Sequence, residues 1–305
     1  MRQRPYGRAM TPKIAFLACP ETLPGSPTRR PDAFEHDLQL AALRDGLGAR
    51  AEVTDIDWQA PLEALSTFDA AYLGTPWDYT EHKDAFLARL EALEAAGVVV
   101  CNPSEVVRWN ADKLYLQDLA ARGAPSIPTL WPAAPGPADI HAAFDHFGTD
   151  RVVVKRRVGA GAIGQNSFTR GDPRLSGWSM DQPAMVQPFL PAIQREGELS
   201  FIFVNGEFSH ALIKRASAGD YRIQSLYGGT EVPLDPCPVD RAAATRIMAM
   251  LPFEQSPLYA RIDMVRLDGG ALAVIEAELI EPYLYPQQGP GFGAMLAEGM
   301  LARLR

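Results

Sequence analysis

Two strand-like segments near the C-terminus place the strictest constraint on how this chain can fold. Residues 258–265 and 273–280 are rich in apolar and β-branched side chains, and a short stretch containing Gly269-Gly270 separates them. Gly-Gly is a favoured two-residue loop between antiparallel strands. The sequence therefore predicts a β-hairpin that turns at Gly269 and Gly270. A three-residue loop would break the pairing that this turn implies.

The predicted hairpin brings four charged side chains together. Asp263 lies opposite Glu276 and Arg261 lies opposite Glu278, and the strand period of two directs all four to one face. Opposed carboxylates repel each other, and one arginine cannot neutralise three of them. Mg²⁺, or Mn²⁺ in its place, can do so through oxygen ligands, which makes the three carboxylates candidate metal ligands. The alternative is an exposed face whose carboxylates form salt bridges with lysines elsewhere.

Length and charge limit the function classes. The 305 residues suffice for two domains or three small ones, and the net charge of −8 argues against a general nucleic-acid binder. No apolar stretch is long enough to span a membrane. Cys19, Cys101 and Cys237 lack metal-ligand spacing, and Cys19 and Cys101 predict buried thiols in a reducing cytoplasm. Residues 1–10 resemble a disordered leader, so Met10 is a possible start. A homo-oligomer stays open, because no segment marks an interface.

The first hundred residues alternate between strand and helix patterns. Strands are expected at 13–19, 51–56, 70–74 and 98–101, and helices at 32–47 and 81–96. This alternation indicates a parallel sheet covered by helices, and ligands bind beyond the carboxyl ends of such strands. The loop 75–79, which contains Trp77, Asp78 and Tyr79, is therefore a candidate substrate loop. An aromatic packing corner explains it equally well.

The remaining chain is predicted to be richer in strands. A helix is expected at 112–122, a surface loop at 132–137 and a strand at 151–155. From residue 183 onward the pattern indicates mainly strands, with a tight hairpin turn at Asn205-Gly206. A helix over 292–304 closes the chain.

A glycine-rich segment over 159–164 formally matches the dinucleotide-binding pattern G-x-G-x-x-G. That site requires a helix to begin there, and residues 165–173 form a poor helix. A glycine-rich loop between two strands can instead fold over a nucleotide and donate backbone N–H groups to its phosphates. Lys155, Arg156 and Arg157 supply positive charge beside this loop.

These pieces occur in an order that resembles the ATP-grasp superfamily, and in particular its glutathione-synthetase-like branch. The resemblance runs from about residue 100 to residue 285, behind a plausible α/β domain. It depends on several short stretches in sequence order: 108–113 with 123–129, 154–155, 185–190, 197–200, 213–229, and the three carboxylates of the hairpin. Each stretch alone is weak, and their common order is what indicates the family.

The resemblance implies a fold and a set of site residues. It implies an α/β and α+β ATP-grasp fold, with an N-terminal parallel α/β domain (11–108), a small lid (109–190) and a mainly antiparallel catalytic part (191–305). ATP would be bound by Lys113, Lys155, Gly159, Gly161, Gln187, Pro188, Phe189, Leu190, Glu198 and Lys214. Mg²⁺ would be held by Asp263, Glu276 and Glu278, while Arg222, Lys214 and Arg261 would act on the transferring phosphate.

The activity that follows is ADP-forming ligation of a small carboxylate, amino-acid-like, to an amine or similar nucleophile through an acylphosphate. A small-molecule kinase and a non-catalytic nucleotide-binding protein are the alternatives. Two departures from the family stand out: Glu278 replaces a common asparagine, and Glu281-Pro282 replaces small residues. Residues 109–113 and 276–282 also resemble a subgroup that contains a ureido-serine cyclo-ligase forming cycloserine. Whether the bond formed is intermolecular or closes a ring is left open.

Overall fold

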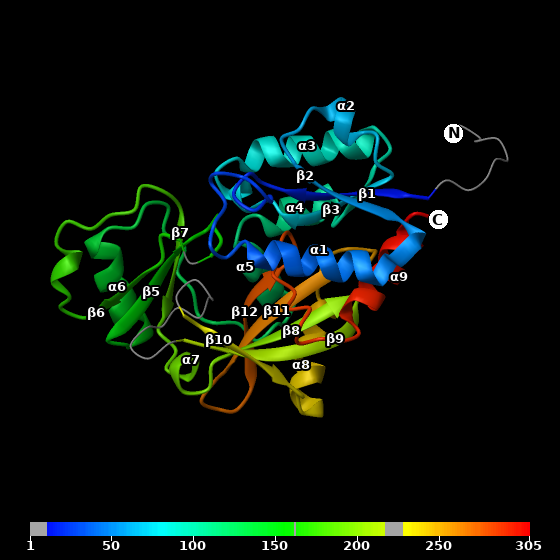
Figure 1. Cartoon of the computed structure of the whole chain (residues 1–305). Coiled ribbons are helices and arrows are strands. Elements are labelled where there is room, and N and C mark those ends of the chain that lie inside the picture. The colour runs from blue at the N-terminus through cyan, green and yellow to red at the C-terminus, as the bar shows by residue number, and fades with distance from the viewer. Residues whose placement is uncertain (1–10, 162, 217–227) are drawn as a thin grey trace.

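The computed structural model describes residues 11–161, 163–216 and 228–305, whose strands form three sheets (Figure 1). The N-terminal sheet is parallel, with strand order β2-β1-β3-β4. A small antiparallel sheet has the order β6-β5-β7, and a larger one has the order β10-β9-β8-β11-β12. The predicted fold class is therefore confirmed. The predicted leader, residues 1–10, lies outside the described residues.

The N-terminal sheet alternates with helices as predicted. Its elements are β1 (Lys13–Ala18), α1 (Phe34–Leu47), β2 (Glu52–Asp57), α2 (Leu62–Leu65), β3 (Ala70–Thr75), α3 (Lys83–Ala95) and β4 (Val99–Cys101), with short 3₁₀ turns at Gly48–Arg50 and Trp77–Thr80. Gly48 ends α1 at a φ of 53°, a backbone conformation that glycine adopts without strain. The carboxyl end of β1 lies on the side of the molecule that holds the small sheet (Figure 1).

The small sheet lies to one side of the molecule (Figure 1). In the chain it comes after α4 (Ser104–Asn110) and α5 (Tyr115–Ala121). The segment that forms it contains α6 (Pro137–Phe147), β5 (Arg151–Arg156), β6 (Asn166–Thr169), a 3₁₀ turn at Pro173–Leu175 and β7 (Ala184–Pro188). The apolar side of α6 packs on β5 through Phe144 and Val152. Helix α4 crosses residue 108, and the domain boundaries at 108 and 190 stay predictions.

The large antiparallel sheet makes up most of the remaining chain. Its elements are α7 (Ala192–Arg195), β8 (Glu198–Val204), β9 (Glu207–Arg215), β10 (Thr230–Leu234), α8 (Pro238–Ala249), β11 (Tyr259–Arg266), β12 (Leu272–Glu278) and α9 (Phe292–Arg303). The predicted turn at Asn205-Gly206 is confirmed, because both residues have positive φ and Val204 pairs with Glu207.

The β11–β12 hairpin has the predicted register but not the predicted loop. Leu267 donates its N–H to the Ala271 carbonyl, so the loop contains three residues, 268–270, and the expected two-residue turn is wrong. One extra residue in β12, Ile275, forms a bulge between the pairs Asp263–Glu276 and Met264–Val274. The bulge cancels the shift that the longer loop introduces, and the charged residues face each other after all.

Two long helices, α6 and α8, lie where none is predicted, as do the shorter helices α2, α4 and α7. Each of the two long helices begins at a proline, Pro137 or Pro238, behind other turn-forming residues. Proline is well suited to the first helical position because the N–H it lacks has no partner there. The prolines therefore start helices that a strand-and-loop interpretation overlooks.

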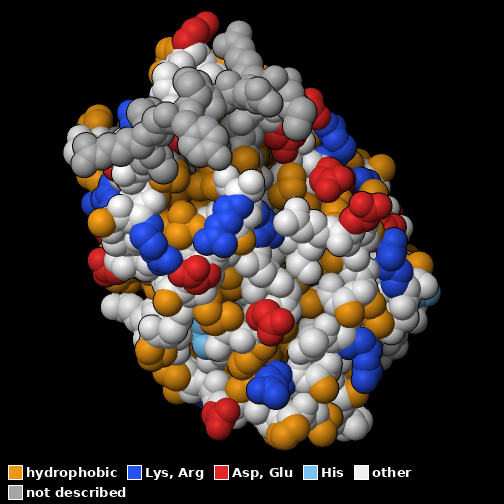
Figure 2. Space-filling view, turned by 90° about the vertical axis from the view of Figure 1, so that its right-hand side faces the viewer, with side chains coloured by type: hydrophobic (Ala, Val, Ile, Leu, Met, Phe, Trp, Pro, Cys, Tyr) orange, Lys and Arg blue, Asp and Glu red, His pale blue; other side chains and the backbone are white. Residues whose placement is uncertain are grey.

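The N-terminal and large sheets share a core. Helices α1 and α9, from opposite ends of the chain, pack side by side at one end of the molecule (Figure 1). On the face viewed from the side of α9, acidic and basic side chains are interspersed (Figure 2). None of the helices that the structure describes is both long enough and apolar enough to cross a bilayer.

Candidate active site

One cleft lies where the three sheets meet, and it collects the predicted site residues. Those that the structure describes all line it: Lys113, Lys155, Gly159, Gly161, Gln187, Pro188, Phe189, Leu190, Glu198, Lys214, Arg261, Asp263, Glu276 and Glu278. Arg222 lies outside the described residues. Segments separated by more than a hundred residues thus form one site, as the predicted order of motifs requires.

The hairpin projects its four charged side chains into this cleft. Arg261 Nε lies 3.1 Å from Asp263 Oδ2, and the Arg261 guanidinium also pairs with Glu278. Ser200 Oγ, on β8, donates to Asp263 Oδ1 at 2.5 Å. Arg261 Nη1 donates to the Tyr283 carbonyl at 2.9 Å. These contacts hold the arginine between two of the three carboxylates.

Two lysines also pair with hairpin carboxylates: Lys113 with Glu276, which has no ion pair with Arg261, and Lys214 with Asp263, which it shares with Arg261. Lys113 Nζ lies 2.8 Å from Glu276 Oε1, and Lys214 Nζ lies 3.1 Å from Asp263 Oδ2. Lysines from distant segments therefore offset part of the charge of these carboxylates. The alternative of salt bridges to lysines holds for the pairing, although the face is enclosed by the cleft rather than exposed.

Burial and ion pairing shift the pKa values of the site carboxylates in opposite directions. Burial works to raise the pKa of Asp263, but Arg261 and Lys214 lower it to about 2. Burial also raises the pKa of Glu278, to about 7, and the nearby carboxylates add to that effect. Burial opposes the ionised form of Glu276, yet Lys113 and Lys155 keep its pKa below the usual value. Asp263 and Glu276 are thus held ionised.

The residues fit a divalent cation by chemistry more than by their present geometry. Among the residues that the structure describes, no three His, Cys, Asp or Glu side chains converge closely enough to hold a metal ion. Asp263, Glu276 and Glu278 nevertheless offer hard oxygen donors from one face of one hairpin. Their present partners are amino and guanidinium groups that can also bind phosphate, so a bound polyphosphate would compete for those partners.

The glycine-rich segment forms the loop between β5 and β6, which pair antiparallel. A strand follows it, so the interpretation as a dinucleotide-binding turn before a helix is excluded. Lys113 Nζ donates to the Gly159 carbonyl at 2.7 Å, and Arg157 pairs with Asp112 at 2.5 Å. The loop is thereby attached to the segment that precedes α5.

Lys155 differs from the other two lysines. It lines the cleft near the end of β5, and its ammonium group has no hydrogen bond or ion pair within the described part of the chain. Burial lowers its pKa. A desolvated ammonium group without a partner is well placed to bind an anion.

Four of the predicted ATP-binding residues, 187–190, follow one another along one wall of the cleft. Gln187 and Pro188 end β7, and Phe189 and Leu190 follow directly. Pro188 has no N–H, and Phe189 donates its N–H to the Arg151 carbonyl at 2.9 Å. Apolar side chains form the walls on either side: Ile127, Val153, Leu190, Ile193 and Ile275.

Glu198, another of the predicted ATP-binding residues, is buried in the cleft. Its carboxylate pairs with Lys214 Nζ at 2.5 Å, and both side chains are buried. Burial raises the pKa of Glu198 to about 7 despite this lysine. The geometry connects Glu198 with the hairpin carboxylates through Lys214.

The opposite end of the cleft is formed by the N-terminal domain. Trp77 and Tyr79 line it, whereas Asp78 accepts hydrogen bonds from Trp58 and Gln59 at 2.7 and 2.9 Å. The loop after β3 is thus both a packing corner and a wall of the site. Residues not predicted as site residues also line this end: Arg30, Asp32, Glu35, Glu281, Tyr283 and Tyr285. The sequence signal that could have identified Glu281 is that Glu281-Pro282 replaces the small residues common in the family.

Comparisons with known proteins agree with this geometry. A family model described as the N-terminal domain of D-cycloserine synthetase DcsG matches residues 14–102. The cycloserine biosynthesis protein DcsG of Streptomyces lavendulae is 30% identical over 283 residues, covering 85% of this chain and 90% of that protein. A glutathione synthetase of Prochlorococcus marinus (strain MIT 9313) is 30% identical over 224 residues, covering 70% of this chain and 67% of that enzyme. The crystal structure of D-cycloserine synthetase DcsG superposes with a TM-score of 0.80 at 26% identity, covering 96% of this chain and all of that one.

Proposed function

The chain belongs to the family of D-cycloserine synthetase DcsG, a branch of the ATP-grasp ligases, and from this premise we propose that it closes a small amino-acid-like acid into a ring. It is an ATP-dependent, ADP-forming ligase that binds ATP and a carboxylate substrate. The resemblance to the glutathione-synthetase-like branch, predicted from the motifs, is confirmed. The observation that carries the proposal of ring closure is the match over 90% of DcsG, including the domain that forms one end of the cleft.

The nucleotide is assigned to the end of the cleft next to the small sheet. The apolar walls fit a purine ring, whose edge would meet neighbouring carbonyl groups and the N–H of Leu190, which has no backbone partner among the residues that the structure describes. Lys155 and Lys113 lie on the side of the glycine-rich loop and would bind the triphosphate. Gly159 and Gly161 let the loop backbone approach those phosphates closely.

The metal ligands of this proposal are Asp263, Glu276 and Glu278. Mg²⁺, or Mn²⁺, bound there would neutralise the charge that develops on the phosphates during transfer. The lysines that now pair with these carboxylates would move to the phosphate oxygens, which leaves the carboxylate oxygens available.

The chemistry takes place between the hairpin and the N-terminal domain. The substrate carboxylate attacks the γ-phosphorus of ATP, which releases ADP and leaves an acylphosphate. A nitrogen of the same molecule then attacks the acyl carbon, and inorganic phosphate leaves. Arg261, with Arg222, would stabilise the transferring phosphoryl group, and the glycine-rich loop would exclude water. Residues 11–108 then supply the substrate side, 109–190 the lid and 191–305 the catalytic sheet. The buried thiols of Cys19 and Cys101 fit a cytoplasmic enzyme.

The test is ADP and phosphate release from Mg·ATP with a panel of amino acids, small peptides and ureido acids that includes O-ureido-serine. One acid alone should release both products, with a ring-closed product by mass spectrometry. Glu276→Gln should lower kcat/KM by at least about 100-fold, because loss of outer-shell partners alone costs 10- to 100-fold. Glu254→Gln, an exposed residue outside the cleft, is the matched control. A joined product of two molecules would overturn ring closure, and a stable phosphorylated acid would indicate a kinase.

A further inference from the structure

The outer edge of β12 carries buried peptide groups that need hydrogen-bond partners from outside the sheet. β12 is the last strand of the large sheet and pairs along one edge with β11, whereas on its outer edge Val274 forms an isolated bridge with Ser126 and donates its N–H to the Pro125 carbonyl at 2.8 Å. Farther along this outer edge, Ala277 directs an N–H and a carbonyl away from β11, and Leu279 directs an N–H the same way. Both residues are buried, and a buried peptide group without a partner is costly.

Two side chains, one from the last residue of α4 and one from the first residue of α5, bind all three of these groups. Asn110 donates from Nδ2 to the Ala277 carbonyl at 2.7 Å and accepts from the Leu279 N–H at 2.9 Å. The Tyr115 hydroxyl accepts from the Ala277 N–H at 3.0 Å. The amide of Asn110 thus pairs with the strand edge as a neighbouring peptide group would.

The peptide groups held in this way lie directly between the two acidic residues of β12. Ala277 separates Glu276 from Glu278, and both glutamates line the cleft, as do Asn110 and Tyr115. Lys113, three residues after Asn110, bridges Glu276 and the Gly159 carbonyl. One short segment therefore holds the backbone of β12, one of its carboxylates and the glycine-rich loop.

We propose that Asn110 is a positioning residue for the reaction: it fixes the β12 backbone so that Glu276 and Glu278 present their carboxylates together to the metal of Mg·ATP. The inference rests on the proposed metal site. Partners of this kind orient ligands without touching the metal, and their loss typically costs 10- to 100-fold in metal affinity or activity. Asn110 contacts neither carboxylate, so its effect passes through the backbone.

The chain contains a matched control for this residue. Asn102 is also a buried asparagine that pairs with strand backbone: Nδ2 donates to the Tyr259 and Leu279 carbonyls at 2.9 and 2.7 Å, and Oδ1 accepts from the Leu258 N–H at 2.6 Å. Its contacts lie at the start of β11 and beyond the end of β12. Replacing Asn102 removes equivalent buried hydrogen bonds without releasing the Ala277 peptide.

The experiment measures the Mg²⁺ concentration that supports half-maximal binding of the non-hydrolysable analogue AMP-PNP, followed by calorimetry. The proteins are the wild type, Asn110→Ala, Asn110→Asp, Asn102→Ala and Glu276→Gln. Asn110→Asp keeps the acceptor for Leu279 and loses only the donor to Ala277, so it tests the inference if Asn110→Ala fails to fold. Both Asn110 variants should require about 10- to 100-fold more Mg²⁺. Asn102→Ala should match the wild type in this concentration, although urea unfolding shows a comparable loss of stability.

Each remaining outcome separates the inference from the proposed function. If Glu276→Gln loses Mg²⁺ dependence while the Asn110 variants behave like Asn102→Ala, the metal site stands and the positioning role is overturned. If the wild type binds AMP-PNP equally well without Mg²⁺, the proposed metal site fails, and the inference fails with it.

Discussion

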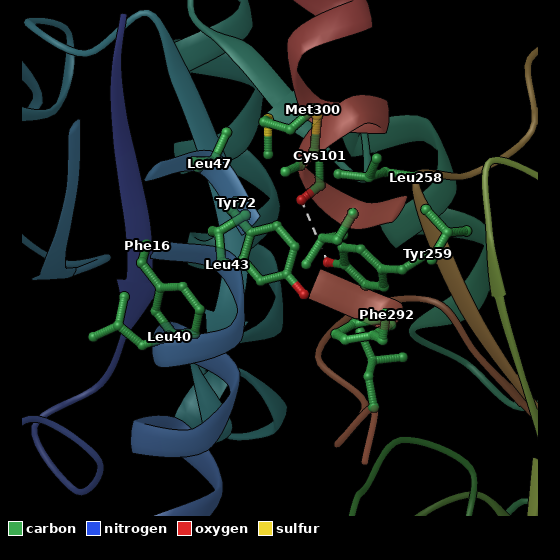
Figure 3. Close-up of a cluster of buried hydrophobic side chains, with 14 of the residues drawn as sticks. Phe16, Leu40, Leu43, Leu47, Tyr72, Cys101, Leu258, Tyr259, Phe292 and Met300 are labelled. Atoms are coloured by element: carbon green, nitrogen blue, oxygen red, sulfur yellow. Dashed lines mark hydrogen bonds between the residues drawn. The ribbon is translucent and has the colours of Figure 1, made fainter. Parts of the chain in front are cut away.

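The start of strand β11 and the part of the strand that enters the cleft differ in how they are held. At its start, Tyr259 lies in a closed core between the N-terminal and large sheets, and neutral hydrogen bonds fix it (Figure 3). Four residues later, Asp263 lies in the cleft within a cluster of ion pairs. The same strand therefore passes from an interface that joins two sheets into the candidate active site.

The closed end is held by hydrogen bonds between uncharged groups. The Tyr259 hydroxyl lies 2.7 Å from the Ile280 carbonyl and within 3.3 Å of the carbonyls of Leu73 and Cys101, and Figure 3 shows it among apolar side chains. At the cleft end, Lys214 bonds to two carboxylates at once. Amides and hydroxyls fix a geometry, whereas ion pairs can exchange a carboxylate for a phosphate. The contrast assigns rigidity to one end of the strand and rearrangement to the other.

The largest effect is expected at Lys214. Lys214→Met removes the partner of Glu198 and Asp263, which are both buried, and should lower the free energy of unfolding by about 3–5 kcal/mol. Urea unfolding measures this loss. Adding Glu198→Gln to that variant should restore part of the stability, because one buried charge is then removed.

The matched change for comparison is Lys13→Met at the exposed start of β1, which should shift stability by less than about 0.5 kcal/mol. Equal losses at the two lysines would contradict a charge cluster that depends on Lys214. The exchange of partners proposed for the cleft would then lose its physical basis.

The closed side of the large sheet should respond to acid through His210. This β9 residue is buried against Phe292, and burial lowers its pKa to about 4. The unfolded chain binds a proton near pH 6.5 while the folded protein resists it, so stability falls as the pH drops below 6.5. Between pH 7 and pH 5 the loss should be about 2 kcal/mol by urea unfolding. His210→Gln should flatten this part of the profile, and an unchanged slope would assign the acid sensitivity to other groups.

The sequence predicts the charged end of the strand better than the contacts that stabilise it. Opposition of Asp263 with Glu276 is correct, but two errors cancel in that prediction: the loop is one residue longer, and Ile275 forms a bulge. Pattern reasoning identifies residues on one face because strands have a period of two. A bulge depends on how the backbone of one strand fits its neighbours, and a single sequence does not contain that information.

Long-range partners are the other part that the sequence leaves out. Lys113 is predicted as a phosphate-binding residue, yet its contact with Glu276 joins positions 163 residues apart in the chain. The role of Asn110 is missed although the stretch that contains it supports the family resemblance. Its signal, an asparagine three residues before a functional lysine, has no meaning until β12 is known to be an edge strand. Motif order was sufficient for the family, and topology was needed for the contacts.

Tyr259→Phe tests the rigid end directly. The variant keeps the ring in the core and removes the hydroxyl, which leaves the Ile280 carbonyl without its 2.7 Å partner. We expect a loss of about 1–2 kcal/mol in the free energy of unfolding, with ADP release per folded molecule unchanged. A fall in kcat of tenfold or more at unchanged stability would show that the closed end takes part in the reaction.

The smallest effect on stability is expected at Lys155, where the effect on function is distinct. The Lys155 ammonium group has no hydrogen bond or ion pair among the described residues, and burial lowers its pKa. Lys155→Met therefore removes a charge that is unfavourable in the folded protein. Stability should stay within about 0.5 kcal/mol of the wild type or rise slightly, while the affinity for ATP falls by about tenfold. Thermal unfolding and calorimetric titration with Mg·ATP measure the two quantities. Lys113→Met, which breaks the pair with Glu276, should lose stability as well as affinity. If Lys155→Met is instead the less stable of the two variants, Lys155 stabilises the folded protein through a partner. The hypothesis that its ammonium group is left unpaired for a phosphate would then be wrong.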